Sequence, residues 1–449
     1  MSFDLLFQQG VRLMREGDAP GAQAAFRATL ALAPHLAAAH INLGLLLTRE
    51  ASWAEAEQHY RTALALAPDL VPAYLHLGAL LAAQKNFSEA ESLYRQALRI
   101  DPASPGAWSN LGVLLACTLR EQEAEDCYRH AMGLDADYRG APFNLAYLLL
   151  RQGRFEEGWH AFESRDWYAR LARHFAYPRW HGEALAGKRL MIGFEGGQGD
   201  MIQFCRYANV AKTRGAAHIA LVCHPALKRL FARMEAVDQV YGFDEDVPAT
   251  GCDYWTPPMS FPWLCGTRID TIPAALPYLH ADPVNVARLA PLTAVDGRQL
   301  RVGLAWQGNS HFENDSDRSL ASLAVLAPLF AVAGVRFFSL QKGVPAPGAP
   351  VTDLAPHSAD FDDTAALIMG LDLVISVDTA VAHLAGALGK PVWVLLPAYK
   401  TDWRWLTVRT DSPWYPGVMR LFRQQLAGDW GDVVSALRDA LVHPTRGQI

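Results

Sequence analysis

A step of 34 residues organises the N-terminal part of this 449-residue chain. Small residues, aromatic residues and prolines each recur at this step and keep the same phase. The recurring positions are Gly10, Gly44, Gly78 and Gly112; Ala22, Ala56, Ala90 and Ala124; Phe26, Tyr60, Tyr94 and Tyr128; and Pro34, Pro68 and Pro102. A fixed period of this length is typical of helical repeats that stack on one another. The period therefore predicts an all-α solenoid of paired helices.

Each recurring position has a physical role in such a stack. The small residues let the two helices of a repeat approach closely, and the aromatic ring fills the space toward the next repeat. Proline ends the second helix because it cannot donate the backbone hydrogen bond that continuation requires. A fifth, weaker copy has Ala146, Leu149, Gly158 and Phe162 at the matching places.

These positions resemble those of the tetratricopeptide repeat family over residues 3–172. The resemblance implies a concave groove that holds a protein or peptide partner. The groove-facing positions carry His40, Asn42, Tyr74, His76, Trp108, Ser109 and Asn110. The asparagines can bond an extended peptide backbone, and a solvated helix face is the alternative.

Composition excludes several functional classes. A net charge of −6 argues against a nucleic-acid-binding face, which needs clustered lysine and arginine. No uncharged apolar run reaches 18 residues, so we expect no membrane span. The six cysteines form no C-x-x-C pair, and the first residues lack a signal-peptide pattern. We therefore expect a cytoplasmic protein with reduced cysteines.

After residue 172 the repeat ends, and short apolar segments alternate with helical ones. Residues 173–187 combine proline and glycine with aromatics and predict a linker. Strand-like runs stand at 189–194, 218–224, 301–306, 335–340, 371–377 and 391–396. Helices are expected between them, among them one from Met201 to about Thr213 and one over 319–330. This alternation predicts parallel sheets buried on both faces. A proline-rich stretch at 247–291 divides them into two Rossmann-like lobes, 188–292 and 293–449.

Ligands of such sheets bind beyond the carboxyl ends of the strands, and two strand-to-helix turns stand out there. The first is Glu195-Gly196-Gly197-Gln198-Gly199-Asp200. Its glycines allow positive φ and close approach of a ligand to the backbone. The turn lacks the Gly-Lys-Ser/Thr ending of a P-loop and is not a full G-x-G-x-x-G motif.

The second turn is Ser376-Val377-Asp378-Thr379-Ala380-Val381-Ala382-His383. Asp378 or Thr379 can cap the following helix, whose free N–H groups then point into the cleft. Thr379 and His383 lie four residues apart, on one face of the first turn. Such an arrangement suits a diphosphate, and core packing of His383 is the alternative.

Residues 188–430 resemble the bacterial family 9 glycosyltransferases, the heptosyltransferase group, which have the two-lobed GT-B fold. Both turns match, as do Trp306-Gln307-Gly308-Asn309 with Asp317-Arg318-Ser319, and Ser339-Leu340-Gln341-Lys342. The chain departs from that group in having Ala380 for glycine and Arg318 for lysine. The fused repeats resemble the layout of O-linked N-acetylglucosamine transferase, which modifies proteins.

The resemblance implies a metal-independent, inverting hexosyl or heptosyl transfer from a nucleotide-sugar donor, with no cofactor. The donor-binding residues it implies in the second lobe are Trp306, Asn309, Arg318, Gln341, Lys342, Asp378, Thr379, Ala380, Val381 and His383. The first lobe would receive the acceptor at Gly196, Gly197, Gln198 and Gly199.

The charge and hydrogen-bonding capacity of these donor- and acceptor-binding residues indicate a role for several of them. Arg318 and Lys342 would neutralise the phosphates, with the amides of the second turn adding hydrogen bonds. Asp200 is the expected general base, and a helix-capping role is its alternative. Asp378 is expected to hold the donor sugar.

Several alternatives stay open at this point. The aromatic stretches 402–405 and 411–416 either line the donor pocket or form a packed loop. Asp360 is expected to cap a helix that starts near Thr364, and the acidic run 244–246 to be a solvated loop. The acceptor is expected to be a protein or peptide held by the repeats. The rival hypotheses are a non-catalytic scaffold with a degenerate donor domain and a transferase for lipid or polysaccharide acceptors.

Overall fold

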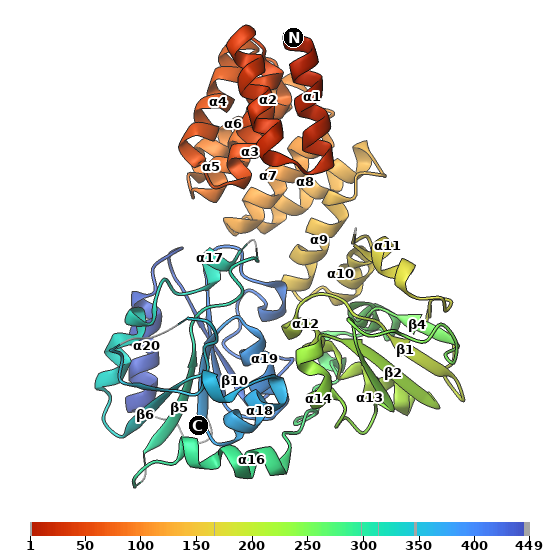
Figure 1. Cartoon of the computed structure of the whole chain (residues 1–449), viewed down its shortest axis with the longest axis vertical. Helices are drawn as coiled ribbons and strands as arrows, with labels where there is room; N and C mark the ends of the chain where they lie inside the picture. The colour runs from red at the N-terminus through yellow and green to blue at the C-terminus, as the bar shows by residue number, and fades with distance from the viewer. Residues whose placement is uncertain (1, 166, 298, 313, 345–347, 444–449) are drawn as a thin grey trace. The chain divides into compact units, whose positions relative to one another are not determined.

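The computed structural model describes residues 2–165, 167–297, 299–312, 314–344 and 348–443 (Figure 1). They form two compact units, Met1–Leu148 and Leu149–Ile449. The first unit is helical, and the second contains two parallel sheets with helices. This confirms the predicted fold class, a helical repeat solenoid followed by a double Rossmann-like domain.

The first unit is built from successive helix pairs, in which each helix packs mainly on its sequence neighbours. The helices are α1 (Phe3–Glu16), α2 (Ala19–Leu32), α3 (Ala37–Arg49), α4 (Trp53–Leu66), α5 (Val71–Ala83), α6 (Phe87–Ile100), α7 (Pro105–Cys117) and α8 (Glu121–Leu134), followed by α9 (Gly140–Arg151), which continues into the second unit.

A glycine on the first helix of each of four repeats lies against an aromatic ring on the second. A Cβ atom placed on these glycines would lie 2.5–2.7 Å from the ring Cε1 atom, closer than any real contact. The pairs are Gly10 with Phe26, Gly44 with Tyr60, Gly78 with Tyr94 and Gly112 with Tyr128. The 34-residue step of glycine and aromatic therefore reflects one packing contact repeated along the solenoid.

The first sheet of the second unit is parallel, with strand order β3-β2-β1-β4. Its strands are β1 (Arg189–Ile192), β2 (His218–Cys223), β3 (Gln239–Gly242) and β4 (Tyr254–Thr256). Its helices are α12 (Gln198–Phe204), α13 (Tyr207–Thr213), α14 (Lys228–Phe231) and α15 (Phe261–Leu264). The strand order reverses between β1 and β4, which is where a doubly wound sheet opens a crevice.

The second sheet is also parallel and has the order β10-β9-β8-β5-β6-β7. Its strands are β5 (Leu300–Ala305), β6 (Val335–Ser339), β7 (Val351–Asp353), β8 (Leu373–Val377), β9 (Val392–Leu396) and β10 (Met419–Arg423). Its helices are α17 (Asp315–Arg318), α18 (Phe361–Met369), α19 (Ala380–Ala387) and α20 (Gly431–Val442). This is the classical doubly wound order of six strands, with its switch point between β5 and β8.

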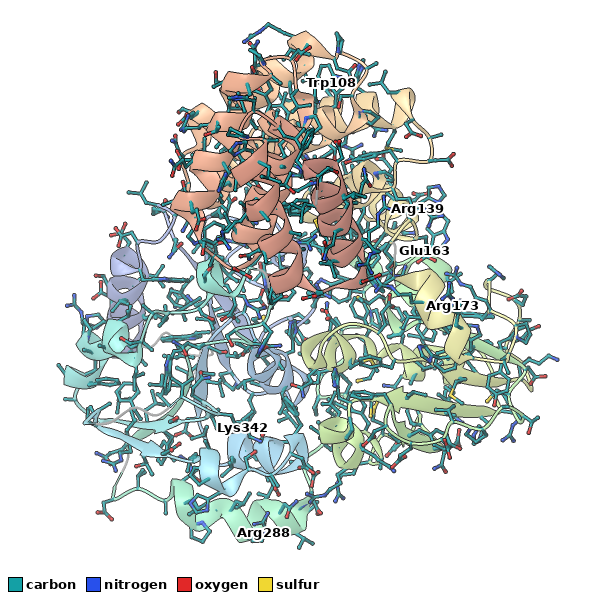
Figure 2. All side chains as sticks on the ribbon, turned by 45° about the horizontal axis from the view of Figure 1, so that its top comes forward. Trp108, Arg139, Glu163, Arg173, Arg288 and Lys342 are labelled. Carbon is teal, nitrogen blue, oxygen red and sulfur yellow. The ribbon has the colours of Figure 1, made fainter. Side chains whose placement is uncertain are left out.

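Helix α16 (Pro283–Leu289) lies between the two sheets in sequence and packs on α18. Arg288 donates to Asp363 Oδ1 at 2.7 Å, and Asn285 donates to the buried Asp362 at 2.7 Å (Figure 2). The acidic N-terminus of α18 therefore anchors the connection between the lobes. Asp360 caps α18 as expected, but the helix begins at Phe361, three residues before the predicted start.

Three local predictions differ from the structure. The helix expected from Met201 to Thr213 is broken between α12 and α13, around Arg206. The helix expected near residue 325 is a 3₁₀ segment, Leu323–Ala331, which contains Pro328. Proline removes a backbone donor and clashes with the preceding turn, so a regular α-helix is unfavourable there. The short strand β4 lies inside the stretch that we took as a proline-rich break.

Helices α10 (Phe155–Phe162) and α11 (Tyr168–Leu171) belong to the second unit. Rings of α10 pack on loops that follow β9: the Trp159 and Trp403 centroids are 5.1 Å apart, and those of Phe155 and Trp414 are 6.1 Å apart. The segment predicted as the second helix of a fifth repeat is thus part of the core of the second unit.

Candidate functional site

The two turns singled out in the sequence both follow strands at a switch point. The glycine-rich turn follows β1, and the Asp378–His383 segment follows β8 and opens α19. Gly199 joins them: a Cβ there would lie 3.0 Å from His383 Cδ2 and 3.5 Å from Ala380 Cα. The absence of a side chain at Gly199 therefore lets α12 approach the start of α19.

Asp200 is the third residue of α12, and its two carboxylate oxygens have different partners. Oδ2 accepts from Gly197 N–H at 2.7 Å, and Oδ1 accepts from the guanidinium of Arg404. Gly196 has φ of +72°, and a Cβ there would also meet Asp200 Oδ2. The side chain stays 28% exposed. The capping role considered for Asp200 is therefore present together with an ion pair to the second lobe.

Arg404 follows β9 and is nearly buried, with its side chain 7% exposed. Besides Asp200 it contacts both oxygens of Asp402 at 3.0 and 3.1 Å, and its Nε donates to Gln203 of α12. The guanidinium lies 4.3 Å from the centre of the Trp403 ring. Arg404 thus fixes α12 against the loop after β9.

A buried ion pair holds the start of the glycine-rich turn. Glu195 is fully buried and accepts from Arg165, which is 1% exposed, through both Nε and Nη2. The Trp167 Nε1 and Met259 N–H groups also donate to this carboxylate, at 2.8 and 3.2 Å. Arg165 reaches Glu163 as well, at 2.7 Å (Figure 2). Residues that follow α10 therefore position the turn that presents Asp200.

Asp378 stands at the end of β8 with its side chain 13% exposed. Its Oδ2 accepts from Trp405 Nε1 at 2.9 Å, and its Oδ1 lies 3.9 Å from His383 Nε2. Burial and the neighbouring Asp402 carboxylate raise the pKa of Asp378 to about 6, against the lowering effect of Arg318. This carboxyl changes charge close to neutral pH.

His383 is buried inside a polar and aromatic shell. Its Nδ1 lies 2.8 Å from the Tyr415 hydroxyl, and its ring stacks on Trp405 with centroids 5.3 Å apart. Burial, with the charges of Arg404, Arg206 and Arg318, holds the pKa of His383 well below its ordinary value. The imidazole is therefore neutral. It is packed inside this shell, and it also lies next to Asp378.

Thr379 occupies the N-cap position of α19, but its side chain makes no capping hydrogen bond. Its hydroxyl instead lies 2.9 Å from Ser376 Oγ. The cap that we expected from Asp378 or Thr379 is thus absent, because both side chains have other partners. Ala380 and Val381 form the first turn of α19, as predicted.

The remaining donor-side residues fall into two groups. Arg318 lies close enough to Asp378 and His383 to influence the pKa of both, and it contacts Asp315 at 3.3 Å. Asn309 forms a local turn with His311, and Lys342 donates to the Ala359 carbonyl at 3.4 Å (Figure 2). The structure therefore groups Arg318 with the second turn and gives Asn309 and Lys342 local partners.

Trp306 and Gln341 are buried at the ends of β5 and β6. The Trp306 ring is 1% exposed and belongs to the apolar core of the second lobe. The Gln341 amide oxygen accepts from the backbone N–H groups of Trp306 and Gln307 at 3.0 and 2.9 Å. Trp306 therefore packs in the core at the end of β5, and Gln341 ties the ends of β5 and β6 together.

The aromatic stretches after β9 form a packed loop, which is one of the two alternatives considered for them. Trp403, Trp405, Trp414 and Tyr415 are at most 1% exposed and form a packed loop. Trp405 and Tyr415 also contact Asp378 and His383 directly. The sequence pattern singled out these stretches, but it did not predict that Arg404 binds Asp200.

Arg206, at the break between α12 and α13, is a second buried arginine that was missed. It donates to the Trp414 carbonyl at 2.7 Å and to the Tyr278 hydroxyl at 2.8 Å. Its guanidinium lies 4.3 Å from the centre of the Tyr278 ring. It thus ties the first lobe to the loop that carries Tyr415.

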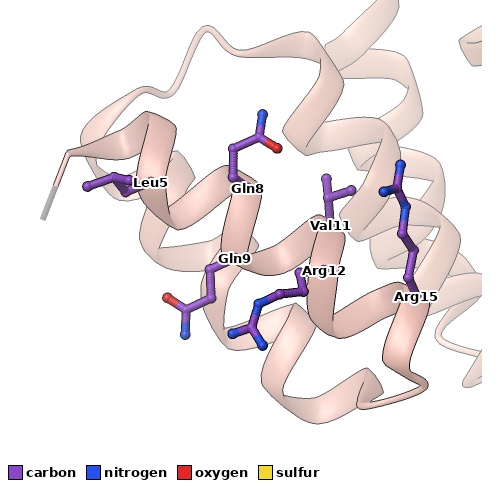
Figure 3. A pocket seen from close by; sticks show the side chains of 6 residues that line it. All are labelled: Leu5, Gln8, Gln9, Val11, Arg12 and Arg15. Atoms are coloured by element: carbon purple, nitrogen blue, oxygen red, sulfur yellow. The ribbon is translucent and has the colours of Figure 1, made fainter.

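A surface hollow on α1 contains none of these residues (Figure 3). It is lined by Leu5, Gln8, Gln9, Val11, Arg12 and Arg15. Among the described residues no group of three or more His, Cys, Asp or Glu is placed to hold a metal ion. None of the helices in the described part of the chain combines the length and apolar character needed to cross a membrane.

Comparisons with known proteins agree with the division into a helical repeat unit and a unit with two parallel sheets. A model described as the middle TPR-like domain of cilia and flagella-associated protein 70 matches residues 16–107. The glycosyltransferase family 9 (heptosyltransferase) model matches residues 340–397, which include Asp378 and His383.

Protein FlbA of Caulobacter vibrioides is 30% identical over 325 residues, which are 65% of this chain and 54% of FlbA. The match thus spans about half the length of that relative.

Solved structures of repeat proteins also match. TTC0263, a TPR protein of Thermus thermophilus, is 21% identical with a TM-score of 0.34, over 36% of this chain and 89% of its own. PilF of Pseudomonas aeruginosa is 22% identical with a TM-score of 0.34, over 37% of this chain and 78% of its own. The family models thus identify an N-terminal TPR-like region, residues 16–107, and a glycosyltransferase family 9 region, residues 340–397, in this chain.

Proposed function

We propose that this protein is a metal-independent, inverting glycosyltransferase that transfers a hexosyl or heptosyl group from a nucleotide sugar to a protein or peptide. The contact between Asp200 and Arg404 carries the proposal. It brings the turn after β1, which offers a partly exposed carboxylate, next to the positively charged Arg404 in the loop after β9, while Gly199 places the same turn against the start of α19, which offers amides.

Asp200 is the proposed general base. A carboxylate accepts about four hydrogen bonds, and Gly197 and Arg404 occupy two of those sites. The exposed part of the side chain leaves room for one acceptor hydroxyl. As the acceptor oxygen bonds to the anomeric carbon, its proton passes to Asp200 and the bond from that carbon to the diphosphate oxygen breaks. Attack opposite the leaving group inverts the anomeric centre.

The leaving diphosphate is the proposed ligand of Arg318 and the first amides of α19. Arg318 is 19% exposed, and its charge already acts on Asp378 and His383. The N-terminus of α19 adds N–H groups at Ala380 and Val381 and a favourable dipole. Neutralising the diphosphate in this way lowers the barrier to its departure. Lys342 and Asn309 would contribute only after a rearrangement of their local partners.

Asp378 is the proposed partner of the donor sugar hydroxyls. Trp405 and His383 hold its carboxylate at the end of β8, and a pKa of about 6 leaves it ionised at pH 7.5. An ionised, oriented carboxylate accepts hydrogen bonds from a sugar more strongly than a neutral group does.

The repeats are the proposed acceptor-binding arm. Asn42 and Asn110 keep the same phase on α3 and α7, and Asn144 of α9 continues it at the 34-residue step. All three side chains are partly exposed, and Asn144 donates to Ser109 at 3.3 Å. Three amides in one phase of the repeat, with His76 at the intervening position, suit the regular backbone of an extended peptide.

Thermal-shift measurements with ADP-, GDP-, UDP- and dTDP-sugars test the donor half of this proposal. A donor at a hundredfold excess over Kd stabilises the folded state by about 2.7 kcal/mol. We expect a shift with one nucleotide class and its loss in Arg318→Ala. A shift with none of the four classes would favour the rival hypothesis of a non-catalytic scaffold. Chelation with EDTA tests the metal-free mechanism, which predicts unchanged transfer.

A further inference from the structure

Three rings meet at the carboxyl edge of the first sheet, beside the glycine-rich turn. Phe194 follows β1, His224 follows β2 and Phe243 follows β3, which are adjacent parallel strands. The ring centroids are 4.8 Å apart for Phe194 and His224, 5.1 Å for Phe194 and Phe243, and 5.1 Å for His224 and Phe243. We call these three residues the ring cluster.

The ring cluster has an open face and an unused polar atom. Phe243 is 50% exposed, so one face of its ring is open to solvent. His224 Nε2 is buried and has no hydrogen-bond partner within the described part of the chain. This buried nitrogen is out of reach of a ligand, so the exposed Phe243 ring is the part of the cluster that a ligand can contact.

The cluster is electrostatically coupled to the proposed base. Burial lowers the pKa of His224, while the Gly196 backbone and the Asp200 carboxylate act to raise it. The imidazole is therefore neutral at pH 7 and can donate or accept one hydrogen bond. Phe194 directly precedes Glu195, the first residue of the glycine-rich turn that carries Asp200, so the ring cluster lies beside the position where the acceptor hydroxyl would react.

The charges that follow the cluster are negative. Asp244 and Asp246 are exposed, and Glu245 is paired with Lys228 at 2.5 Å. A phosphate- or carboxylate-rich acceptor would be repelled by this acidic run, whereas a neutral or basic one would not.

We infer that the ring cluster is the acceptor subsite and selects a hydroxyl-bearing peptide segment with an apolar residue beside the hydroxyl and no acidic residue nearby. The apolar side chain packs on the open face of Phe243, whose ring rests on Phe194 and His224. The inference rests on the proposed transfer to a protein or peptide and specifies which segments are accepted.

The test uses the full chain, the nucleotide sugar that gives a thermal shift, and a serine-centred peptide library in which each flanking position is varied. We expect peptides with leucine, isoleucine or phenylalanine next to serine to be modified about tenfold better than those with alanine, since they bury one more apolar side chain. Peptides with aspartate, glutamate or phosphoserine there should be the poorest acceptors.

Two variants locate the preference. Phe243→Ala should remove the apolar preference, and the double variant Asp244→Asn with Asp246→Asn should relax the discrimination against acidic peptides. Both should keep the donor thermal shift of the wild type. Trp263→Ala, at an exposed aromatic of the same lobe outside the cluster, is the matched control and should keep the wild-type profile. The double variant changes only exposed residues, so it still tests the inference if Phe243→Ala fails to fold.

Three results would overturn the inference: a flat library profile, an unchanged profile in both variants, or modification of the anionic saccharide octyl glucuronide in preference to every peptide. In each of these the donor thermal shift persists, so the donor half of the proposed function stands. Absence of any donor shift, in contrast, contradicts the proposed function itself.

Discussion

Arg404, in the loop after β9, donates a hydrogen bond to Oδ1 of Asp200, which lies on α12 of the other lobe. The two residues are 204 positions apart in the chain. The same guanidinium binds Asp402, whose carboxylate contributes to the raised pKa of Asp378. The charge of Arg404 is therefore shared between the proposed base and the proposed donor side.

Replacing Arg404 tests whether this contact positions Asp200. Arg404→Lys keeps the charge but loses the fork that reaches Asp200, Asp402 and Gln203 together. We expect the rate of transfer to fall by about a hundredfold, the order seen when a positioning contact is displaced, with the donor thermal shift retained. Arg423→Lys, at a nearby arginine whose guanidinium donates to the Arg409 and Trp405 carbonyls, is the control. Equal rates for wild type and Arg404→Lys would contradict the positioning role.

The Arg165–Glu195 pair should contribute strongly to stability. Both side chains are fully buried, and breaking such a pair by removing one charge costs about 3–5 kcal/mol. Glu195→Gln should lower the free energy of unfolding of the second unit by this order, followed by tryptophan fluorescence in urea. The exposed pair Arg409–Asp411 is the matched control. Asp411→Asn should cost less than about 1 kcal/mol, and an equally small effect of Glu195→Gln would show that the buried pair does not hold the turn.

Asp378 should make stability depend on pH between about 4 and 6. Its pKa is raised to about 6 in the folded protein, so its ionisation disfavours the folded state. This contribution is fully present below the ordinary pKa of an aspartate and is lost as pH rises through 6. Removing the charge with Asp378→Asn should therefore raise the free energy of unfolding at pH 7.5 by up to about 3 kcal/mol.

The same variant should have little effect on stability at pH 4, where Asp378 is already protonated, and it should reduce transfer at pH 7.5. Urea unfolding at the two pH values measures the difference. Exposed Asp244→Asn serves as the control and should leave stability unchanged at both. A loss of stability in Asp378→Asn at pH 7.5 would mean that this carboxylate is stabilised, rather than destabilised, by its surroundings.

The glycine–aromatic contact of the repeats can be tested at Gly78. A Cβ there would lie 2.5 Å from Tyr94 Cε1, so Gly78→Ala should destabilise the solenoid by about 1–3 kcal/mol through overpacking. Gly133, in α8, has no atom within 4 Å of its Cβ position. Gly133→Ala should be neutral or slightly stabilising, because alanine favours a helix over glycine. Helical circular dichroism during thermal unfolding compares the two, and equal effects would refute the contact as the reason for the repeated glycine.

Local patterns explain what could be predicted from the sequence. The solenoid follows from a fixed step, because each repeat packs mainly on its neighbours in sequence. Asp200, Asp378 and His383 were singled out because polar residues directly after buried strands collect at the carboxyl edge of a parallel sheet. The structure does bring Gly199, Ala380 and His383 together.

Long-range side-chain partners could not be predicted in this way. Neither Arg404 nor Arg165 stands at a strand end or in a motif, and their partners are 204 and 30 residues away. The burial of Trp306 and Gln341 also depends on how the ends of β5 and β6 close over the core, which strand pattern alone does not determine. The ring cluster was missed because its three members come from three separate strand ends and share no spacing.

The most direct test of the account is the release of nucleoside diphosphate from the donor that gives a thermal shift, measured for the wild type and Asp200→Asn with the peptide library present. We predict release that depends on the peptides in the wild type. For Asp200→Asn we predict an unchanged donor shift with release reduced by about a thousandfold, the scale of a lost general base. Equal release by the two proteins would contradict the assignment of Asp200. Failure of the wild type to release nucleoside diphosphate from any nucleotide sugar would contradict the proposed transfer.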